Sequence, residues 1–415
     1  MHSRLGALAP RIPRPALKAA ALLGVAAIAL AACGSSKNTS STSSSSSGPS
    51  YTIAYEGPLS GGNAQLGLNM KYAVQLAIQQ ANAGTTFGKL PFTLKFTTQD
   101  DQGSATQSPT AAQALINDSS VVAVVGPAFS GATKAAEPFF HEANLATVSP
   151  SATDPGLATQ GWTNFFRVVA DDNAQGPADA SYIVKKLGDK SVYSVDDASA
   201  YASGLVGTFD TAAQSAGATV THETAPGSTQ CQAGTGNVQQ YGALAQKVKA
   251  ANPSAVFYAG YYCDFALLAK AVRGAGYTGQ LASDDGSLDP HYIAQAGASL
   301  AEGTIASCAC GDITKVPAGA SFVTAFKKLA GFAVGTYSAE SYDATNTIIS
   351  VMKGMGKTIT RAGIVTALHS VNYQGITKDV QFQSDGNISG TAVYVYQVKS
   401  GTFVQLGLVS QLVGS

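Results

Sequence analysis

Short runs of β-branched and aromatic residues alternate with segments of helical period from Tyr51 onward. The strand predicted at 51–56, for example, is followed by a helix whose apolar residues recur at helical spacing from Met70 to Ala81. Such alternation is typical of parallel sheets, in which each strand is followed by a helix that covers the sheet. The sequence therefore predicts an α/β fold built on doubly wound parallel sheets.

The alternation comes in two series, one before and one after Asp171. The first predicts strands at 51–56, 92–97, 121–125 and 146–149, with helices at 70–81, 106–117 and 133–143. The second predicts strands at 191–195, 219–222, 255–258 and 279–282, with helices at 204–216, 238–251 and 265–275. After the second series, the sequence predicts a strand at 303–306, then helices at 322–329, 341–355 and 361–368. It ends with predicted strands at 380–382, 392–398 and 403–408.

The 365 residues from Tyr51 onward are more than one hydrophobic core usually holds. Two lobes joined by a multi-strand hinge are therefore predicted. Lobe one comprises 51–170 and 311–389, and lobe two comprises 171–310 and 390–415.

The first 32 residues have the pattern of a secretory signal peptide. Four basic residues and no acidic one lie among the first 18, and an apolar stretch follows at 19–32, too short to span a membrane. The stretch ends in Leu-Ala-Ala-Cys-Gly, which resembles the bacterial lipoprotein signal. That resemblance implies lipidation of Cys33; an ordinary signal peptide with a chance cysteine is the alternative.

Residues 33–50 are predicted to form a flexible tether. They are mostly serine, and such a segment cannot bury enough apolar surface to fold. Without the signal peptide the chain has 21 Lys and Arg against 25 Asp and Glu, a net charge of about −4. No block of like charge occurs, and nothing indicates a nucleic-acid partner.

Four cysteines remain after Cys33, namely Cys231, Cys263, Cys308 and Cys310. An even number in an exported chain indicates disulfides, and four cysteines allow three pairings. A bridge between Cys308 and Cys310 would close a very small, strained ring, so Cys231–Cys263 is the favoured pair. A zinc site is the competing interpretation, but no second close Cys or His pair accompanies these residues.

Two loops of the first series carry hydroxyl groups where a ligand would bind. In a doubly wound sheet, ligands bind beyond the carboxyl ends of the strands. Ser130 follows the predicted strand 121–125 just ahead of a helix, where backbone N–H groups and the positive helix end favour a carboxylate. The segment 149–153 repeats that arrangement after the next strand. Two ordinary helix caps are the alternative interpretation.

Several segments, taken in order, resemble a known family. They are YTIAYEGPLSGGNAQLG (51–67), TTQDDQG (97–103), VVAVVGPAFSGAT (121–133), ATVSPSATDPGL (146–157), NFFRVVADDNAQGPADA (164–180) and VFYAGYYCDFALLAKAVRGAGYTGQLASDDG (256–286). Their order and spacing resemble the leucine/isoleucine/valine-binding branch of the type I periplasmic-binding-protein family. The resemblance implies a two-lobed fold that closes on its ligand, an ABC permease as partner, and no catalytic activity or cofactor.

The resemblance also assigns ligand contacts. It implies that the backbone carboxylate and amine of a bound amino acid contact Ser130, Ser151, Ala152 and Thr153. It places Tyr201, Tyr261 and Asp285 at the clamp positions of the second lobe, where a carboxylate would hold the ligand's ammonium. The family usually has Glu at the position of Asp285. Leu66, which replaces a frequent aromatic, and Tyr337 would line the side-chain pocket.

Other chemistries find little support in the sequence. The five histidines are scattered without metal-ligand spacing, and no nucleophile-elbow serine or phosphate loop occurs. Neither a catalytic residue nor a bound metal is therefore predicted. The chain is expected to be a monomer held at the outer surface of the cell membrane by its lipid. A ligand sensor of the same fold, or a binding protein for an amide or urea, is the alternative function.

Overall fold

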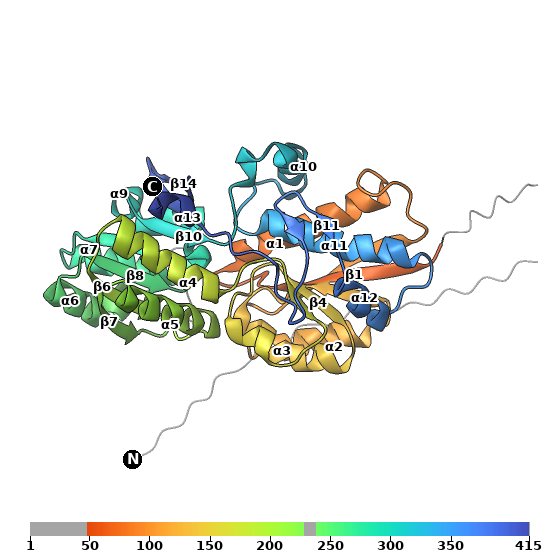
Figure 1. The fold of residues 1–415 in the computed structure, drawn as a ribbon, viewed down its shortest axis with the longest axis horizontal. Helices are drawn as coiled ribbons and strands as arrows, with labels where there is room; N and C mark the ends of the chain where they lie inside the picture. The colour runs from red at the N-terminus through yellow and green to blue at the C-terminus, as the bar shows by residue number, and fades with distance from the viewer. Residues whose placement is uncertain (1–47, 228–237, 415) are drawn as a thin grey trace, which may run out of the picture. The chain divides into compact units, whose positions relative to one another are not determined.

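A computed structural model describes residues 48–227 and 238–414. The predicted signal peptide, Cys33, nearly all of the tether, and Cys231 lie outside these residues. Figure 1 shows the described part as two large sheets, each covered by helices; the first is parallel and the second mainly parallel. The predicted fold class is thus confirmed. No helix in the described part is long and apolar enough to cross a membrane.

The first sheet has five strands in the order β2-β1-β3-β4-β5, all parallel. Its central strand, with the sequence VVAVV, is buried along its whole length, as expected for a parallel strand covered on both faces. In Figure 1, helices α1 and α11 lie above the strands and α2 and α3 below. The strands are β1 (Ser50–Gly57), β2 (Thr93–Asp100), β3 (Val121–Val125), β4 (Ala146–Ser149) and β5 (Phe165–Arg167). The helices are α1 (Ala64–Asn82), α2 (Ser108–Asn117), α3 (Ser130–Glu142), α10 (Ala320–Ala330), α11 (Ser338–Met355) and α12 (Arg361–Leu368).

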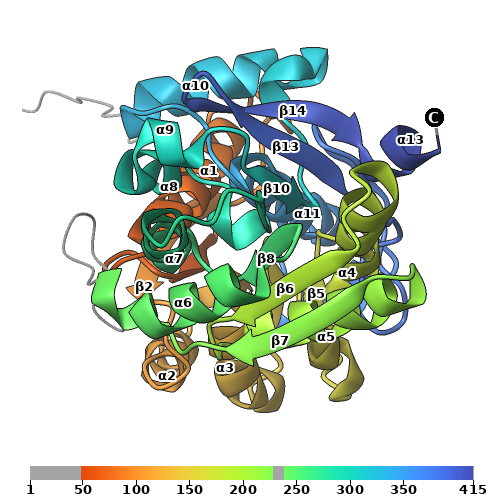
Figure 2. The same ribbon diagram turned by 90° about the vertical axis from the view of Figure 1, so that its left-hand side faces the viewer.

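The second sheet has seven strands in the order β14-β13-β10-β9-β8-β6-β7. The strands from β7 to β10 are parallel, whereas β13 is antiparallel to both β10 and β14. Figure 2 shows this sheet with β13 and β14 at one edge and β7 at the other. The strands are β6 (Ser191–Asp196), β7 (Thr219–Thr224), β8 (Ala255–Ala259), β9 (Gln280–Ser283), β10 (Ile305–Cys308), β13 (Tyr394–Lys399) and β14 (Thr402–Leu408). Around it lie α4 (Asp172–Ala180), α5 (Ala200–Ser215), α6 (Gly242–Ala251), α7 (Tyr262–Gly274), α8 (Pro290–Ala296), α9 (Ala298–Ala301) and α13 (Val409–Val413).

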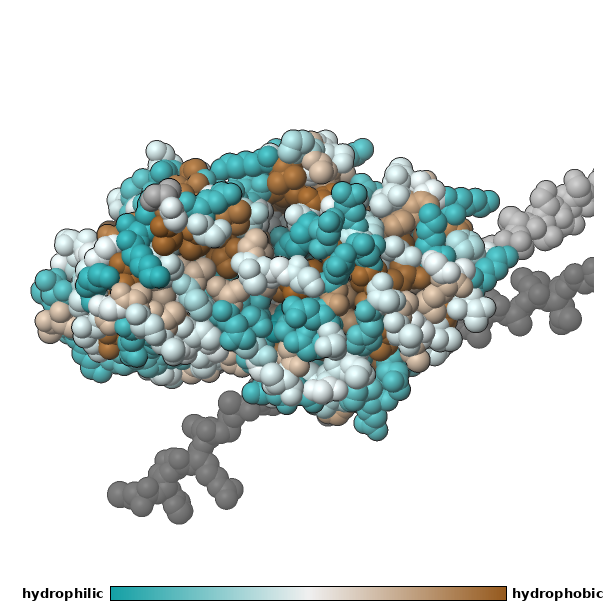
Figure 3. Space-filling view, viewed as in Figure 1, coloured by the Kyte–Doolittle hydropathy of each residue, from teal (hydrophilic) through white to brown (hydrophobic). Residues whose placement is uncertain are grey.

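The chain passes between the two sheets three times. It leaves the first sheet after β5, returns after β10, and crosses again before β13. The three crossings meet around a cavity of about 190 Å³ lined by Ala170, Ala309 and Gly390, one residue from each. Hydrophilic residues cover much of the face shown in Figure 3, although only 12% of the chain is charged.

The sequence did not predict β5 or the helix that follows it. Helix α4 continues into a π-helical turn at Ser181–Lys186, and it contains Gly176 and Pro177, which are poor helix formers. Gly176 is required by packing, because a Cβ atom there would lie 2.1 Å from Oγ1 of Thr208 on α5. The strand expected at 380–382 is also shorter: β12 covers only Asp379–Val380, and it pairs with β11 (Tyr373–Gln374).

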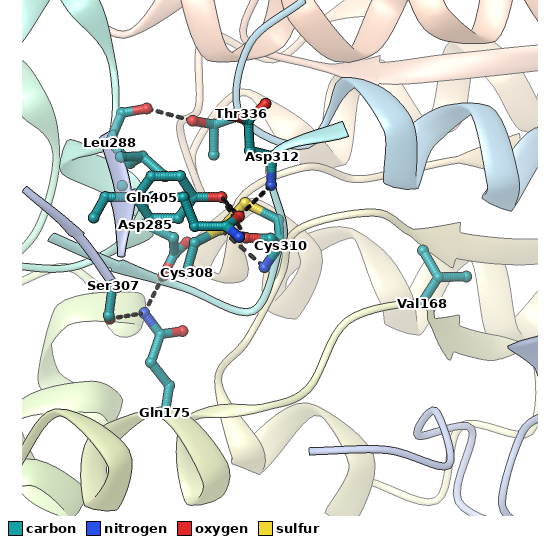
Figure 4. Close-up of a disulfide and its surroundings, with 12 residues drawn as sticks. Val168, Gln175, Asp285, Leu288, Ser307, Cys308, Cys310, Asp312, Thr336 and Gln405 are labelled. Atoms are coloured by element: carbon teal, nitrogen blue, oxygen red, sulfur yellow. Dashed lines mark hydrogen bonds between the residues drawn. A yellow bond between two sulfur atoms is a disulfide. The ribbon is translucent and has the colours of Figure 1, made fainter. Parts of the chain in front are cut away.

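The expectation that Cys308 and Cys310 do not form a disulfide with each other is wrong. They form a disulfide, seen in Figure 4, whose Cα atoms are 4.9 Å apart. Two residues of extended strand would separate these atoms by about 6.6 Å, so the chain bends at Ala309 as it leaves β10. Cys263 is also disulfide-bonded. Its partner lies outside the described residues, and the pairing with Cys231 stays a prediction.

Candidate functional site

Seven of the nine predicted ligand-binding residues line one cavity. They lie just beyond the carboxyl ends of strands in both sheets or at the start of the helices α1 and α11, the location expected for a ligand in doubly wound sheets. The full lining is Leu66, Met70, Ala128, Phe129, Ser130, Ser151, Tyr201, Tyr261, Asp285, Gly286 and Tyr337. The cavity measures about 20 Å³, which is room for about one water molecule and too little for an amino acid.

Aromatic contacts between the loops of the two sheets close this cavity. The ring of Phe129, after β3, stacks on that of Tyr261, after β8, with 4.3 Å between centroids. Next to it, the hydroxyl of Tyr262 donates to the carbonyl of Gly62 at 2.7 Å. A ligand can therefore enter only if these loops separate.

Asp285 provides the principal polar group of the cavity. Its Oδ1 atom accepts hydrogen bonds from Nε2 of Gln175 at 2.7 Å and from the hydroxyl of Tyr201 at 2.8 Å; Figure 4 shows the first of these. The side chain is buried, and it makes no ion pair within the described residues. Burial raises the pKa of Asp285, because a charged carboxylate without water or a cation is costly.

Two further buried carboxyl groups surround Asp285. Burial, and next the charge of Asp285, raise the pKa of both Asp172 and Asp284. The Oδ2 atom of Asp284 accepts a hydrogen bond from the amide of Gly260 at 2.8 Å. Three carboxyl groups thus share one desolvated region, and their combined potential favours a cation.

The two predicted serines already have partners in the protein. Ser130 is the first residue of α3, three residues before the predicted start, and its Oγ atom accepts from the amide of Asp154 at 3.2 Å. The Oγ atom of Ser151 donates to the carbonyl of Ala128 at 2.6 Å. These bonds hold the two loops after β3 and β4 together and place both hydroxyls on the cavity wall.

The segment 149–153 differs from the prediction in two ways. No α-helix follows it, because Asp154 instead caps a short 3₁₀ helix at Pro155–Thr159. Ala152 and Thr153 also lie behind the wall: the amide of Ala152 donates to Oγ of Ser149, and both residues are fully buried. The second expected helix end at the cavity is therefore absent.

Arg167, at the end of β5, holds this segment in place. Its fully buried guanidinium donates to the carbonyls of Ala152 at 3.1 Å and Asp154 at 2.8 Å. It also pairs with Asp171 at 3.1 Å and donates to Oδ1 of Asn387 at 2.6 Å. One side chain thus ties a loop of the cavity to the first and third crossings.

Sequence reasoning missed five residues of the site, among them Ala128 and Gly286 of the lining. Met70 was assigned only to the apolar face of its helix, and Phe129 lay unmarked inside the quoted loop 121–133. Gln175, which contacts Asp285 without lining the cavity, lies on the unpredicted helix α4. The only sequence signal for Gln175 was its place in the polar segment 171–175, which follows the predicted end of lobe one and precedes a glycine.

The chain matches the family model described as "Periplasmic binding protein" over residues 50–402. It is 27% identical over 358 residues to "Leu/Ile/Val-binding protein homolog 3" of Brucella melitensis, covering 86% of this chain and 93% of the relative. It is 25% identical to the "Leucine-, isoleucine-, valine-, threonine-, and alanine-binding protein" of Pseudomonas aeruginosa, covering 83% and 89%.

Among solved structures, the branched-chain amino acid transporter substrate-binding protein LivJ of Streptococcus pneumoniae, in complex with isoleucine, superposes with a TM-score of 0.75. It shares 25% identity with this chain and covers 86% of it and 99% of LivJ. The family model covers most of the chain, and the two-sheet fold with a cavity between loops agrees with it. The chain therefore belongs to the periplasmic binding protein family, whose members bind substrates and are not enzymes.

Proposed function

We propose that this protein captures an amino acid with an apolar side chain, branched-chain or similar, and delivers it to the permease of an ABC importer. The single observation that carries the proposal is Asp285. It is a buried carboxylate on the cavity wall, fixed by Gln175 and Tyr201, with no cation beside it within the described residues. The ammonium of an amino acid supplies that missing charge.

The rest of the cavity fits the other parts of such a ligand. Ser130 begins a helix of 13 residues, whose first N–H groups and positive end attract a carboxylate. Leu66, Met70 and Phe129 form an apolar wall for the side chain. Both relatives are named for leucine, isoleucine and valine, which have this combination of groups, and one of them also for threonine and alanine.

Capture requires the two lobes to open and close. The present arrangement leaves about 20 Å³ and stacks Phe129 on Tyr261, so we propose that the loops part to admit the ligand and close on it. Ligand contacts to both sheets then favour the closed form. The shift in free energy between the open and closed forms equals the difference in the ligand's binding free energy for the two forms. The permease would recognise that closed form.

A thermal-unfolding screen tests the proposed ligand. The protein without its first 32 residues is melted with each amino acid and with small amides, urea and sugars. At a hundredfold excess over its dissociation constant, a ligand of the folded state adds about 2.7 kcal/mol of stability. Stabilisation by leucine, isoleucine or valine supports the proposal. A response to an amide, urea or sugar alone would refute the role of Asp285.

We further propose that the protein acts as an extracytoplasmic monomer anchored by a lipid on Cys33. The proposal rests on the apolar stretch at 19–32 and the Leu-Ala-Ala-Cys-Gly sequence at its end. Two acyl chains hold a protein on a membrane stably, whereas one does so marginally. Cys33→Ser should move the protein from the membrane fraction to the soluble fraction. Retention of the variant on membranes would refute the lipid anchor. A dimeric mass for the released protein would refute the monomer.

A further inference from the structure

A second cavity, of about 260 Å³, lies beside the crossings. Four segments line it: 288–293 near α8, 310–314 after β10, 334–340 at the start of α11, and 396–403 in β13 and β14. Its lining shares only Tyr337 with the cavity that contains Asp285. It is therefore a separate compartment, and it has the space for a small molecule that the first cavity lacks in this arrangement.

Most of its wall is apolar, with Leu288, Ile293, Val334 and Phe403 among the lining residues. Two acids interrupt it: Asp312, which is partly exposed and pairs with Lys315 at 3.9 Å, and the buried Glu340. The side chain of Glu340 is only 2% exposed, its Oε1 atom has no hydrogen-bond partner within the described residues, and it forms no ion pair there. A carboxylate buried without a counter-charge is costly to keep.

The nearby groups compensate Glu340 only in part. It lies in the first turn of α11, where the helix dipole favours an acid. Lys378 lines the adjoining cavity of about 190 Å³ together with Glu340, but its Nζ atom donates to the carbonyl of Val168 at 3.2 Å. A cationic donor in the larger cavity would satisfy the carboxylate directly.

We infer that this second cavity is a binding site for a small amine, with Glu340 holding its ammonium and the apolar wall holding its carbon skeleton. The ligand class follows from the wall: one buried acid and apolar surroundings select one positive group on an apolar body. Nothing in this assignment depends on which molecule occupies the Asp285 cavity.

The position of the cavity also links it to the first site. Its walls come from both lobes, since 334–340 packs with the first sheet and 288–293 with the second, and Oγ1 of Thr336 donates to the carbonyl of Leu288 (Figure 4). Tyr337, with φ at +63°, has a backbone conformation that few L-residues adopt, and it contacts both cavities. An amine bound in the second cavity would stabilise the present arrangement of the two lobes. It would therefore change the affinity of the Asp285 cavity for its own ligand. This linkage rests on the proposed function, whereas the site itself does not.

The test is calorimetric titration of the full chain with isobutylamine and benzylamine, without any amino acid present. Isobutanol and benzyl alcohol serve as uncharged counterparts. We expect an amine to bind, its alcohol to bind at least roughly tenfold more weakly, and Glu340→Gln to weaken the amine by a similar factor, since a charge-assisted hydrogen bond is lost. Equal affinities for amine and alcohol, or no amine binding, would overturn the site.

Two variants separate the second cavity from its alternatives. Asp285→Asn removes the carboxylate of the first cavity and should leave amine binding in place. Glu142→Gln removes one negative charge at an exposed position outside both cavities, and it should also leave amine binding unchanged. Loss of amine binding in Asp285→Asn together with its retention in Glu340→Gln would assign the amine to the first cavity and refute the inference. Unfolding curves of each variant show whether the fold is intact.

The linkage is tested separately. Once an amino acid that binds is known, its dissociation constant is measured with and without saturating amine. We expect a change, and the same factor must appear in the amine's dissociation constant when the amino acid is saturating. Unchanged constants would refute the linkage.

Discussion

Replacing Asp285 with Asn should lower ligand affinity without weakening the fold. Both hydrogen bonds recorded for the carboxylate, from Gln175 and Tyr201, go to Oδ1, and the carbonyl oxygen of Asn can accept them in the same place. The substitution removes one negative charge from a region that also contains the buried carboxyl groups of Asp172 and Asp284. The ligand-free variant should therefore be at least as stable as the wild type.

The loss of affinity can be estimated from the interaction that disappears. A hydrogen bond to a charged group contributes about 1.5–3 kcal/mol. At about 1.4 kcal/mol for each tenfold change, the dissociation constant for an amino acid should rise roughly 10- to 150-fold. The carboxylate end and the side chain of the ligand keep their contacts, so binding is weakened rather than abolished.

The matched control is Glu137→Gln. Glu137 is buried and burial raises its pKa to about 8, yet it does not line the cavity, and its partners are Thr147 and Asn164. Its substitution should leave affinity nearly unchanged. Titration calorimetry gives the affinity, and urea unfolding gives the stability. Unchanged affinity in Asp285→Asn, or equal losses in both variants, would refute a direct contact between Asp285 and the ligand's ammonium.

Three further outcomes follow from the structure. Arg167→Lys should destabilise the protein by about 3 kcal/mol, because lysine cannot reproduce the forked contacts of a buried guanidinium; a loss below 1 kcal/mol in urea unfolding would contradict this. Serine at both Cys308 and Cys310 should cost only about 1–2 kcal/mol, since the disulfide closes a loop of three residues, and a loss above 4 kcal/mol would show a larger role. Burial raises the pKa of Glu340 to about 7, so folding favours the protonated form of this side chain. As the pH rises from 4 to 8, the wild type should therefore lose about 3 kcal/mol of unfolding free energy relative to Glu340→Gln. Parallel pH profiles of the unfolding free energy in the two proteins would disprove this.

The sequence predicted those parts of the fold whose local pattern is strong. Strands β3 and β4 and helix α12 have the predicted bounds. The two strands contain the β-branched residues that favour strands, and the helix begins directly after Thr360, whose side chain caps it. Helix α4 escaped prediction because its stability comes from packing on α5, which a glycine permits. Tertiary contact overrides propensity in such a segment.

The site was predictable where a loop follows a predicted strand. Ser130, Tyr261 and Asp285 meet in the cavity as the edges of the sheets require. Gln175 and the cavity of Glu340 could not be found in this way. The second cavity has walls from four segments spread over more than a hundred residues, and no local pattern encodes that meeting.

The order in which the strands occur along the chain has a consequence for folding. Strand β10 pairs with β13, so that Ile305 lies opposite Gln397, and the intervening chain supplies helices to the first sheet. The hydroxyl of Tyr51 likewise donates to the carbonyl of Lys357, 306 residues away. Each half of the molecule thus needs residues from near the end of the chain before it is complete. A nascent chain released early should expose unfinished sheet edges, and loop closure over such separations should make folding slow and dependent on full-length synthesis.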